Sequence, residues 1–400
     1  MLDAYIYDGL RSPIGRVTSA LAPVRPDDLV SEVIRALVAR APFAPDQIED
    51  VVLGCTNQAG EDSRNVARHA GLLAGLPVEV AGQTINRLCA SGLAAVIEAA
   101  RAVTCKEGDL LVAGGVESMS RAPFALSKAE NAYSRNVEIY DTTMGARFPN
   151  PKIVAAFGND TMPETAENIA RELQITREAS DIFAAASQSK YAAAKADGFF
   201  DAEIHPVSVP AGKKKPPVLV AEDEHPRPGT TLEALAKLPS LFEGGVVTAG
   251  NASGINDGAA ALLIGSREVG ERVGAKPMGR LVAAAAAGVP PRVMGLGPVP
   301  ATRKALERAG LTLDDMDVIE INEAFAVQVL GCLKELGLAA DDSRVNPNGG
   351  AIAVGHPLGC SGARLALTAL RQLHRSGGRY ALVTLCIGVG QGLAAIIERT

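Results

Sequence analysis

Two cysteines stand where a thiol could do chemistry. Cys89, in N-R-L-C-A-S-G at 86–92, directly precedes a predicted helix, whose unpaired N–H groups and dipole favour the nucleophilic thiolate. Cys386 ends a predicted strand and precedes the spaced glycines of I-G-V-G-Q-G at 387–392, whose N–H groups can face a ligand. For each, the commoner alternative is a buried apolar cysteine, so both are candidates that need partners.

Two further polar residues could supply such partners. His356 lies in N-G-G-A-I-A-V-G-H-P-L-G at 348–359, and these glycines permit the close backbone approach that a catalytic loop needs. A lone loop histidine is ordinarily solvated, so the glycine setting carries this interpretation. Asn322 follows a predicted strand in N-E-A-F at 322–325, where it could orient a water or a polar substrate group.

Composition restricts the classes of protein to consider. The chain has 400 residues, 47% of them hydrophobic and 21% charged, which is ordinary for a globular protein of two to three domains. A net charge of −6 argues against a nucleic-acid partner. No apolar tract is long enough for a bilayer, and the start M-L-D-A lacks the basic and apolar segments of a signal peptide. The six cysteines show no metal-ligand spacing, so we expect no metal, free thiols and a cytoplasmic location.

Short apolar runs alternate with helical periodicities along the chain. Strands are predicted at 4–7, 51–54, 110–114, 259–264, 318–321 and 380–385. Helices are predicted at 26–40, 92–103, 163–174, 177–197, 300–309 and 362–375. This alternation predicts an α/β protein built of β-α-β units with a mostly parallel sheet.

The two ends of the chain repeat the same pattern. Residues 47–54 and 315–322 each run from an acidic segment into a buried strand, and a Ser-Gly helix start follows each at a similar spacing. An internal duplication would place the Cys89 turn and the His356 loop in equivalent positions, although generic β-α-β units could mimic it. We predict an N-terminal half at 1–121, an inserted loop domain at 122–248, completion of the first half at 249–270 and a C-terminal half at 271–400.

The motifs together resemble the thiolase family. The resemblance rests on N-R-L-C-A-S-G-L with Cys89, G-G-V-E-S-M-S at 114–120, G-N-A-S-G-I-N-D-G-A at 250–259, N-E-A-F at 322–325, G-G-A-I-A-V-G-H-P at 349–357 and C-I-G-V-G-Q-G at 386–392. It implies a five-layer αβαβα fold of two duplicated halves with an inserted loop domain, and a homo-oligomer, either a dimer or a tetramer.

The resemblance also implies a role for each candidate. Cys89 would attack the 3-oxo group of a 3-oxoacyl-CoA, and Cys386 would protonate the acetyl-CoA enolate and then deprotonate the incoming CoA. His356 would keep Cys89 ionised and, with a water held by Asn322, stabilise the enolate. The N–H groups of Cys89 and Gly388 would form a second oxyanion hole. CoA would be a co-substrate, with no permanently bound cofactor.

Coenzyme A contacts and one departure also follow from the resemblance. The positions that match the family's CoA contacts are Met162, Arg227, Phe242, Ser253 and Phe325. The run K-K-K at 213–215 could meet phosphates or simply be a solvated loop. Val389 stands where biosynthetic thiolases have glycine, and because valine resists positive φ we predict an extended backbone there.

The variable segments indicate a subgroup. Residues 57–68, 140–151 and the G-V-G-Q-G ending resemble the 3-oxoadipyl-CoA thiolases of aromatic-compound degradation. Ala90 instead resembles acetoacetyl-CoA thiolases, so acetyl-CoA C-acetyltransferase stays the alternative, and a non-catalytic acyl-CoA-binding protein is disfavoured because all four polar candidates are present. Arg147, the only cation in 140–151, could bind the distal carboxylate of 3-oxoadipyl-CoA, or serve a subunit interface or a surface ion pair.

Overall fold

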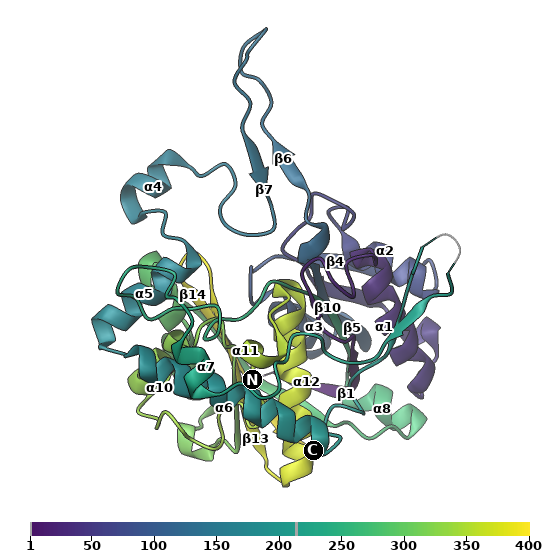
Figure 1. Ribbon diagram of the computed structural model, residues 1–400. Helices are drawn as coiled ribbons and strands as arrows, with labels where there is room; N and C mark the ends of the chain where they lie inside the picture. The colour runs from purple at the N-terminus through teal and green to yellow at the C-terminus, as the bar shows by residue number, and fades with distance from the viewer. Residues whose placement is uncertain (1, 213–214) are drawn as a thin grey trace.

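A ten-stranded sheet runs through the computed structural model, which describes residues 2–212 and 215–400 (Figure 1). Its order is β12-β13-β14-β11-β1-β10-β5-β3-β4, with the short β2 (Gly15–Arg16) paired to β10. The strands are β1 (Ala4–Arg11), β3 (Asp50–Gly54), β4 (Ala81–Ile85), β5 (Leu110–Ser118), β10 (Asn256–Gly265), β11 (Gly279–Gly288), β12 (Val318–Ile321), β13 (Tyr380–Ile387) and β14 (Gln391–Arg399).

The sheet repeats itself on either side of the β1–β11 pair. One side reads β1-β10-β5-β3-β4 and the other reads β11-β14-β13-β12, where a parallel bridge from Ile319 to Val345 takes the place of the β3–β4 pair. The helices follow the same order: α1 (Pro26–Arg40), α2 (Val66–Ala74) and α3 (Ser91–Thr104) in the first half, and α9 (Pro298–Ala309), α10 (Ala326–Leu336) and α12 (Leu358–Ser376) in the second. The predicted duplication is therefore present in the topology.

The prediction of a mostly parallel sheet is wrong. The β3–β4, β3–β5 and β12–β13 pairs are parallel, as β-α-β units require, but the remaining pairs are antiparallel. The antiparallel strands β11 and β14 were not predicted. Strand β11 is alanine-rich, and alanine has little intrinsic preference for strands, so its place is set by packing between β1 and β14.

Helices and sheet alternate in five layers. Helices α3 and α12 lie in the centre and pack against both halves of the sheet, while α1 and α2 cover one outer face and α9 and α10 the other (Figure 1). Glycine lets the two central helices touch, because a Cβ on Gly362 would overlap the backbone nitrogen of Leu93. This contact fixes the N-terminal ends of α3 and α12 against each other.

The region between the halves carries its own elements. They are η2 (Met119–Arg121), β6 (Phe124–Leu126), β7 (Ile139–Asp141), α4 (Pro151–Phe157), α5 (Met162–Leu173), α6 (Arg177–Ala196), β8 (Val207–Val209), β9 (Val218–Val220) and α7 (Leu232–Ala236). The β6–β7 hairpin projects from the top of the molecule (Figure 1). Arg11 of β1 is fully buried and forms ion pairs with Glu203 at 2.6 Å and Asp223 at 2.7 Å. These ion pairs connect the region to the first half. Its predicted borders at 122 and 248 stay a prediction.

The remaining elements are short. They comprise η1 (Pro45–Gln47), α8 (Arg267–Val273), η3 (Pro291–Leu296), η4 (Leu313–Asp315) and α11 (Ala351–Val354). Among the described residues, no helix combines the length and the hydrophobicity that crossing a bilayer requires.

Candidate active site

A tight turn holds Cys89 at the start of α3. Leu88 adopts a φ of +46°, a left-handed conformation that costs a side-chain-bearing residue conformational energy. Ser91 compensates by closing the turn: its Oγ donates to the Leu88 carbonyl at 2.6 Å and accepts from the Arg87 N–H at 2.8 Å. The strained backbone of Leu88 and the hydrogen bonds of Ser91 that offset it lie next to the predicted nucleophile, and backbone strain is common at functional sites.

The prediction that Cys89 is a thiolate in the free protein is wrong. Burial raises the pKa of the Cys89 thiol to about 11, and this outweighs the hydrogen bond from the Gly388 N–H, which lowers it. The thiol also lies before the first residue of α3, where the helix contributes less than at its first turn. Cys89 is therefore a protonated thiol near neutral pH and needs a base in order to react.

Cys386 and Gly388 approach Cys89 from the end of β13. Cys386 is fully buried, and burial together with the nearby Cys89 thiol raises its pKa well above the ordinary value. The Gly388 N–H is near enough to the Cys89 sulfur to lower the pKa of the thiol, which is consistent with an oxyanion-hole donor. Side chains of Leu88 and Met162 cover Gly388, since a Cβ there would lie 3.3 Å from Leu88 Cδ1 and 3.8 Å from Met162 Sδ. The structure thus brings both cysteines and Met162 together.

The predicted extended backbone at Val389 is wrong. Val389 has a φ of +64° and Gly390 a φ of +80°, within the tight turn that joins β13 to β14. Because Ile387 pairs directly with Gln391, only three residues are left to reverse the chain, and this forces the left-handed conformation despite the valine side chain. The side chain is 63% exposed, so no packing offsets the strain, and the turn keeps the shape that presents Gly388.

His356 and Asn322 form a buried pair. Asn322 Nδ2 lies 3.3 Å from His356 Nε2, and His356 Nδ1 lies 2.6 Å from Ser361 Oγ. Ser361 Oγ donates its own hydrogen to the Pro357 carbonyl at 2.8 Å, so the Nδ1 atom must be the donor to Ser361. His356 Nε2 therefore carries the lone pair, and Asn322 Nδ2 donates to it.

The His356 imidazole is neutral. Burial, together with the positive charge of Arg364, lowers its pKa to about 3. A neutral ring whose Nε2 lone pair accepts only the hydrogen bond from Asn322 can take up a proton in its place, and the protonated Cys89 thiol needs such an acceptor. Ser361 lies in the turn of α12 that packs on the Cys89 end of α3, so the imidazole and the thiol are held at the two touching helix starts.

Two residues that sequence reasoning did not single out hold the loop of His356. Asn256 Oδ1 accepts the His356 N–H at 2.9 Å, while its Nδ2 donates to the Gly15 carbonyl at 2.9 Å. Buried Glu117 accepts N–H groups from Thr56, Asn57 and Gly359, which joins β5 to the start of α12. Both residues lie inside motifs noted in the sequence, and a buried polar residue there was the available signal.

Of the remaining predicted CoA positions, two lie side by side and two lie in separate loops. The Ser253 N–H donates to the Ala324 carbonyl at 3.0 Å, and Ala252 forms an antiparallel β-bridge with Phe325. Ser253 and Phe325 are therefore neighbours in space, and Phe325 follows Asn322 by three residues in the sequence. Arg227 and Phe242 lie in loops on either side of α7, with Arg227 tied through its N–H to Gln188 Oε1 at 2.9 Å. Lys213 and Lys214 lie outside the described residues, and Lys215 is exposed.

Arg147 lies in the loop after β7. Its Nη1 donates to the Thr142 carbonyl at 3.2 Å, and Thr142 Oγ1 accepts from Asn57 Nδ2 at 2.9 Å. Across the described ranges no carboxylate lies within 4.0 Å of this exposed guanidinium. Among the described residues, the surface ion pair considered from the sequence is thus not formed.

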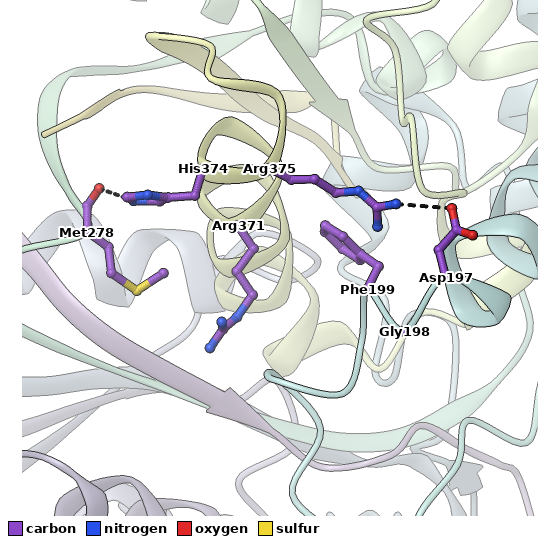
Figure 2. Close-up of a pocket in the computed structure, with 7 residues that line it drawn as sticks. All are labelled: Asp197, Gly198, Phe199, Met278, Arg371, His374 and Arg375. Carbon is purple, nitrogen blue, oxygen red and sulfur yellow. Dashed lines mark hydrogen bonds and ion pairs between the residues drawn. The ribbon is translucent and has the colours of Figure 1, made fainter.

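A separate pocket lies at the other end of α12 (Figure 2). Arg371, His374 and Arg375 line it. Arg375 binds Asp197 at 3.0 Å and His374 binds the Met278 carbonyl at 2.7 Å, whereas the buried Nε of Arg371 has no hydrogen-bond partner among the described residues. The helix rise separates this end from Ser361 by roughly 20 Å, so the pocket is not part of the cysteine site. In the described part of the chain, no group of three or more His, Cys, Asp and Glu side chains could hold a metal ion.

Comparisons with known proteins agree with this geometry. Residues 4–268 match the family model "Thiolase, N-terminal domain" and residues 275–399 match "Thiolase, C-terminal domain". The chain is 60% identical to the 3-oxoadipyl-CoA/3-oxo-5,6-dehydrosuberyl-CoA thiolase of Escherichia coli K12, and 58% identical to a beta-ketoadipyl-CoA thiolase of Acinetobacter baylyi, over the full length of each. Human mitochondrial 3-ketoacyl-CoA thiolase in complex with CoA superposes with a TM-score of 0.91 at 38% identity, covering 100% of this chain and 98% of that one.

Proposed function

Because this chain belongs to the thiolase family, we propose that it is an acyl-CoA C-acyltransferase that cleaves 3-oxoadipyl-CoA with CoA, giving acetyl-CoA and succinyl-CoA. The observation that supports this most is that the half-buried Cys89 thiol, the buried Cys386 thiol, the Gly388 N–H and the His356–Asn322 pair lie where two touching helix starts meet the ends of β12 and β13. The identities to thiolases named for 3-oxoadipyl-CoA and beta-ketoadipyl-CoA support this substrate over acetoacetyl-CoA and support a role in the β-ketoadipate pathway.

In the first half of the proposed reaction, Cys89 becomes acylated. His356 Nε2 takes the proton of Cys89, and the sulfur attacks C3 of the 3-oxoacyl group. The N–H groups of Gly388 and Cys89 bind the oxygen that becomes negative. The C2–C3 bond then breaks, leaving a succinyl thioester on Cys89 and the enolate of acetyl-CoA, which takes the proton of the Cys386 thiol at C2.

In the second half, the acyl group passes to coenzyme A. The Cys386 thiolate accepts the proton of the CoA thiol, and the CoA sulfur attacks the thioester carbonyl. Cys89 leaves as the thiolate and recovers its proton from His356, so that every group returns to its starting state. During the enolate stage, Asn322 and His356 would stabilise the thioester oxygen, and the unpartnered Asn322 Oδ1 can hold a water there.

Coenzyme A would enter as a co-substrate past Met162, Ser253 and Phe325. Met162 covers the oxyanion-hole glycine, and Ser253 and Phe325 adjoin each other at the start of α10, so this group spans the approach to Cys89. Arg227 and Phe242, in the loops around α7, would contact parts of coenzyme A that are more distant from its thiol.

Two features support a homo-oligomer, either a dimer or a tetramer, and the state of the cysteines supports a cytoplasmic location. Strand β4 is the edge of the sheet and is only partly covered, and the β6–β7 hairpin exposes Phe124, Leu126 and Ile139. Apolar surface of this kind marks an interface. The six cysteines are free thiols, which a reducing compartment would preserve.

A substrate panel tests the function and, with it, the role of Arg147. We expect CoA-dependent cleavage of 3-oxoadipyl-CoA to have a higher kcat/KM than cleavage of acetoacetyl-CoA. The Cys386→Ala variant should lose about 10²–10⁴-fold in kcat/KM with both substrates.

If Arg147 binds the distal carboxylate, Arg147→Met lowers kcat/KM about 10- to 150-fold for 3-oxoadipyl-CoA only. A preference for acetoacetyl-CoA would establish acetyl-CoA C-acetyltransferase instead, and equal losses in Arg147→Met would assign Arg147 to the fold or to an interface.

A further inference from the structure

The pocket at the C-terminal end of α12 carries an excess of positive charge. It has a volume of about 240 Å³ and is lined by Arg371, His374 and Arg375, whose spacing places them on one face of α12 (Figure 2). Among the described residues that line the pocket, Asp197, just after α6, is the only carboxylate, and Arg375 binds it at 3.0 Å. The charge of Arg371 therefore has no counterion in the lining.

Arg371 is a largely buried arginine with few partners. Its side chain is 15% exposed, and its Nη2 donates to the Gly9 carbonyl at 3.1 Å. Asp8 Oδ1 lies 3.7 Å from the same nitrogen, which is beyond hydrogen-bond distance, and Asp8 is already bound by Arg40 Nε at 2.6 Å. Within the part of the chain that the structure describes, Nη2 is the only nitrogen of Arg371 that forms a hydrogen bond, and its Nε is buried without a partner.

Arg11 shows how the same chain neutralises a buried arginine that has a structural role. Its Nε binds Glu203 at 2.6 Å and its Nη1 binds Asp223 at 2.7 Å, so two carboxylates contact one guanidinium. For Arg371, burial lowers the pKa, and the more distant carboxylates of Glu203 and Asp8 only partly offset that effect. Because buried charges in proteins are normally paired, an anion from outside the chain would complete the surroundings of Arg371.

Basic residues at the end of a helix often serve only to complement the helix dipole. That role accounts for His374 and Arg375, which lie in the last turn of α12 and have partners in the Met278 carbonyl and in Asp197. It does not account for Arg371, which lies before the last turn and is largely buried. In the view of Figure 2, its side chain runs between those of Met278 and Phe199.

We propose that this pocket binds a phosphate group, either free phosphate or that of a small organic phosphate, through Arg371 with Arg375 beside it. A phosphate group offers about two negative charges and three acceptor oxygens, so it can bind both arginines at once. The side chains of Phe199 and Met278 add apolar surface to the lining, which an organic substituent would contact. The inference goes beyond the proposed function and does not rest on it, because the pocket is separate from the cysteine site.

Isothermal titration calorimetry with inorganic phosphate tests this, at constant ionic strength and without acyl-CoA. We expect saturable binding with a Kd of about 1 mM. Arg371→Gln removes a charge-assisted bond and should weaken binding about 10- to 150-fold. Arg308→Gln is the matched control, because Arg308 also lies in the last turn of a helix, α9, and donates to a backbone carbonyl, that of Ala284. This control should bind phosphate like the wild type.

A variant with the opposite sign separates charge from packing. Asp197→Asn removes the carboxylate that competes for Arg375 and should tighten phosphate binding about fivefold. The Asp197 side chain is 63% exposed, so this variant keeps the test decisive even if Arg371→Gln does not fold. No saturable binding to the wild type, an unchanged Kd in folded Arg371→Gln, or weaker binding in Asp197→Asn would overturn the proposal.

A second probe, phenyl phosphate, distinguishes the two sources of the phosphate group. Tighter binding than that of inorganic phosphate would support an organic phosphate, since the phenyl ring can pack on Phe199 and Met278. Equal or weaker binding would support free phosphate as the ligand. In both cases Arg371→Gln must weaken the binding of phenyl phosphate as it weakens that of phosphate, and an unchanged Kd would place phenyl phosphate elsewhere and overturn the assignment.

Discussion

At the residue scale, the proposed role of His356 is to take the proton of Cys89 and so make the thiol reactive. Because burial raises the pKa of Cys89 to about 11, the thiolate is scarce near neutral pH and its alkylation rate should rise through pH 8 to 10. Removing the base in His356→Ala should move the alkylation midpoint to higher pH. The measurement follows the Cys89 peptide in a Cys105→Ala background, since Cys105 is exposed and would consume reagent. An unchanged profile would reduce His356 to a structural loop residue.

Val389 gives a second prediction at this scale. A β-branched residue at a φ of +64° stores strain of order 1–3 kcal/mol, and glycine adopts this conformation without it. We expect Val389→Gly to raise the free energy of unfolding by about 1 kcal/mol, after the greater entropy of glycine in the unfolded chain is subtracted. Urea denaturation measures this, and thiolysis should be retained because the turn already has the conformation that glycine prefers. A loss of stability would show that the side chain, although exposed, has a contact in the assembled protein.

At the scale of elements, the crossing of α3 and α12 positions the site. In Gly362→Ala the added methyl would overlap the Leu93 backbone nitrogen, so the helix starts that carry Cys89 and His356 must separate. Overpacking of this kind costs about 1–3 kcal/mol of unfolding free energy, and we expect thiolysis to fall more steeply than stability. Gly71→Ala is the matched control on α2, where the new methyl meets Val51 at an ordinary 3.4 Å. If the two variants lost thiolysis activity and stability to the same extent, the contact between α3 and α12 would not be what positions the site.

The sequence predicted these elements well where a local pattern specified them. The bounds of α1 are as predicted, and both central helices were predicted to within a few residues, because amphipathic periodicity and Ser-Gly starts are local signals. Strand β11 was missed because an alanine run has no strand pattern of its own. The ionisation of Cys89 and the φ of Val389 were wrong for the same reason: burial and hairpin closure depend on residues distant in the sequence.

At the scale of the whole molecule, one surface is unlike the rest. Phe124, Leu126 and Ile139 lie together on the two strands of the β6–β7 hairpin and are 60% to 74% exposed, whereas most large apolar side chains of the described residues are buried in defined cores. A two-stranded hairpin is marginally stable alone, and this one projects from the molecule, so another surface is needed to hold it (Figure 1). Exposed apolar side chains on a projecting hairpin are typical of a segment that packs against a second copy of the chain.

Replacing these three residues by serine should therefore reduce the mass of the assembly, measured by sedimentation velocity or light scattering over a range of protein concentrations. Each apolar side chain contributes about 1.5–3 kcal/mol when buried, so their joint loss should weaken association by several orders of magnitude. Alkylation of Cys89 should keep its pH dependence, because the hairpin lies outside the contacts that set its pKa. Serine substitution of Leu72 and Leu73, which are 42% and 44% exposed on α2, serves as the control for lost surface hydrophobicity. An unchanged mass in the hairpin variant would show that the hairpin does not hold the oligomer together, and the edge strand β4 would then be the surface to test.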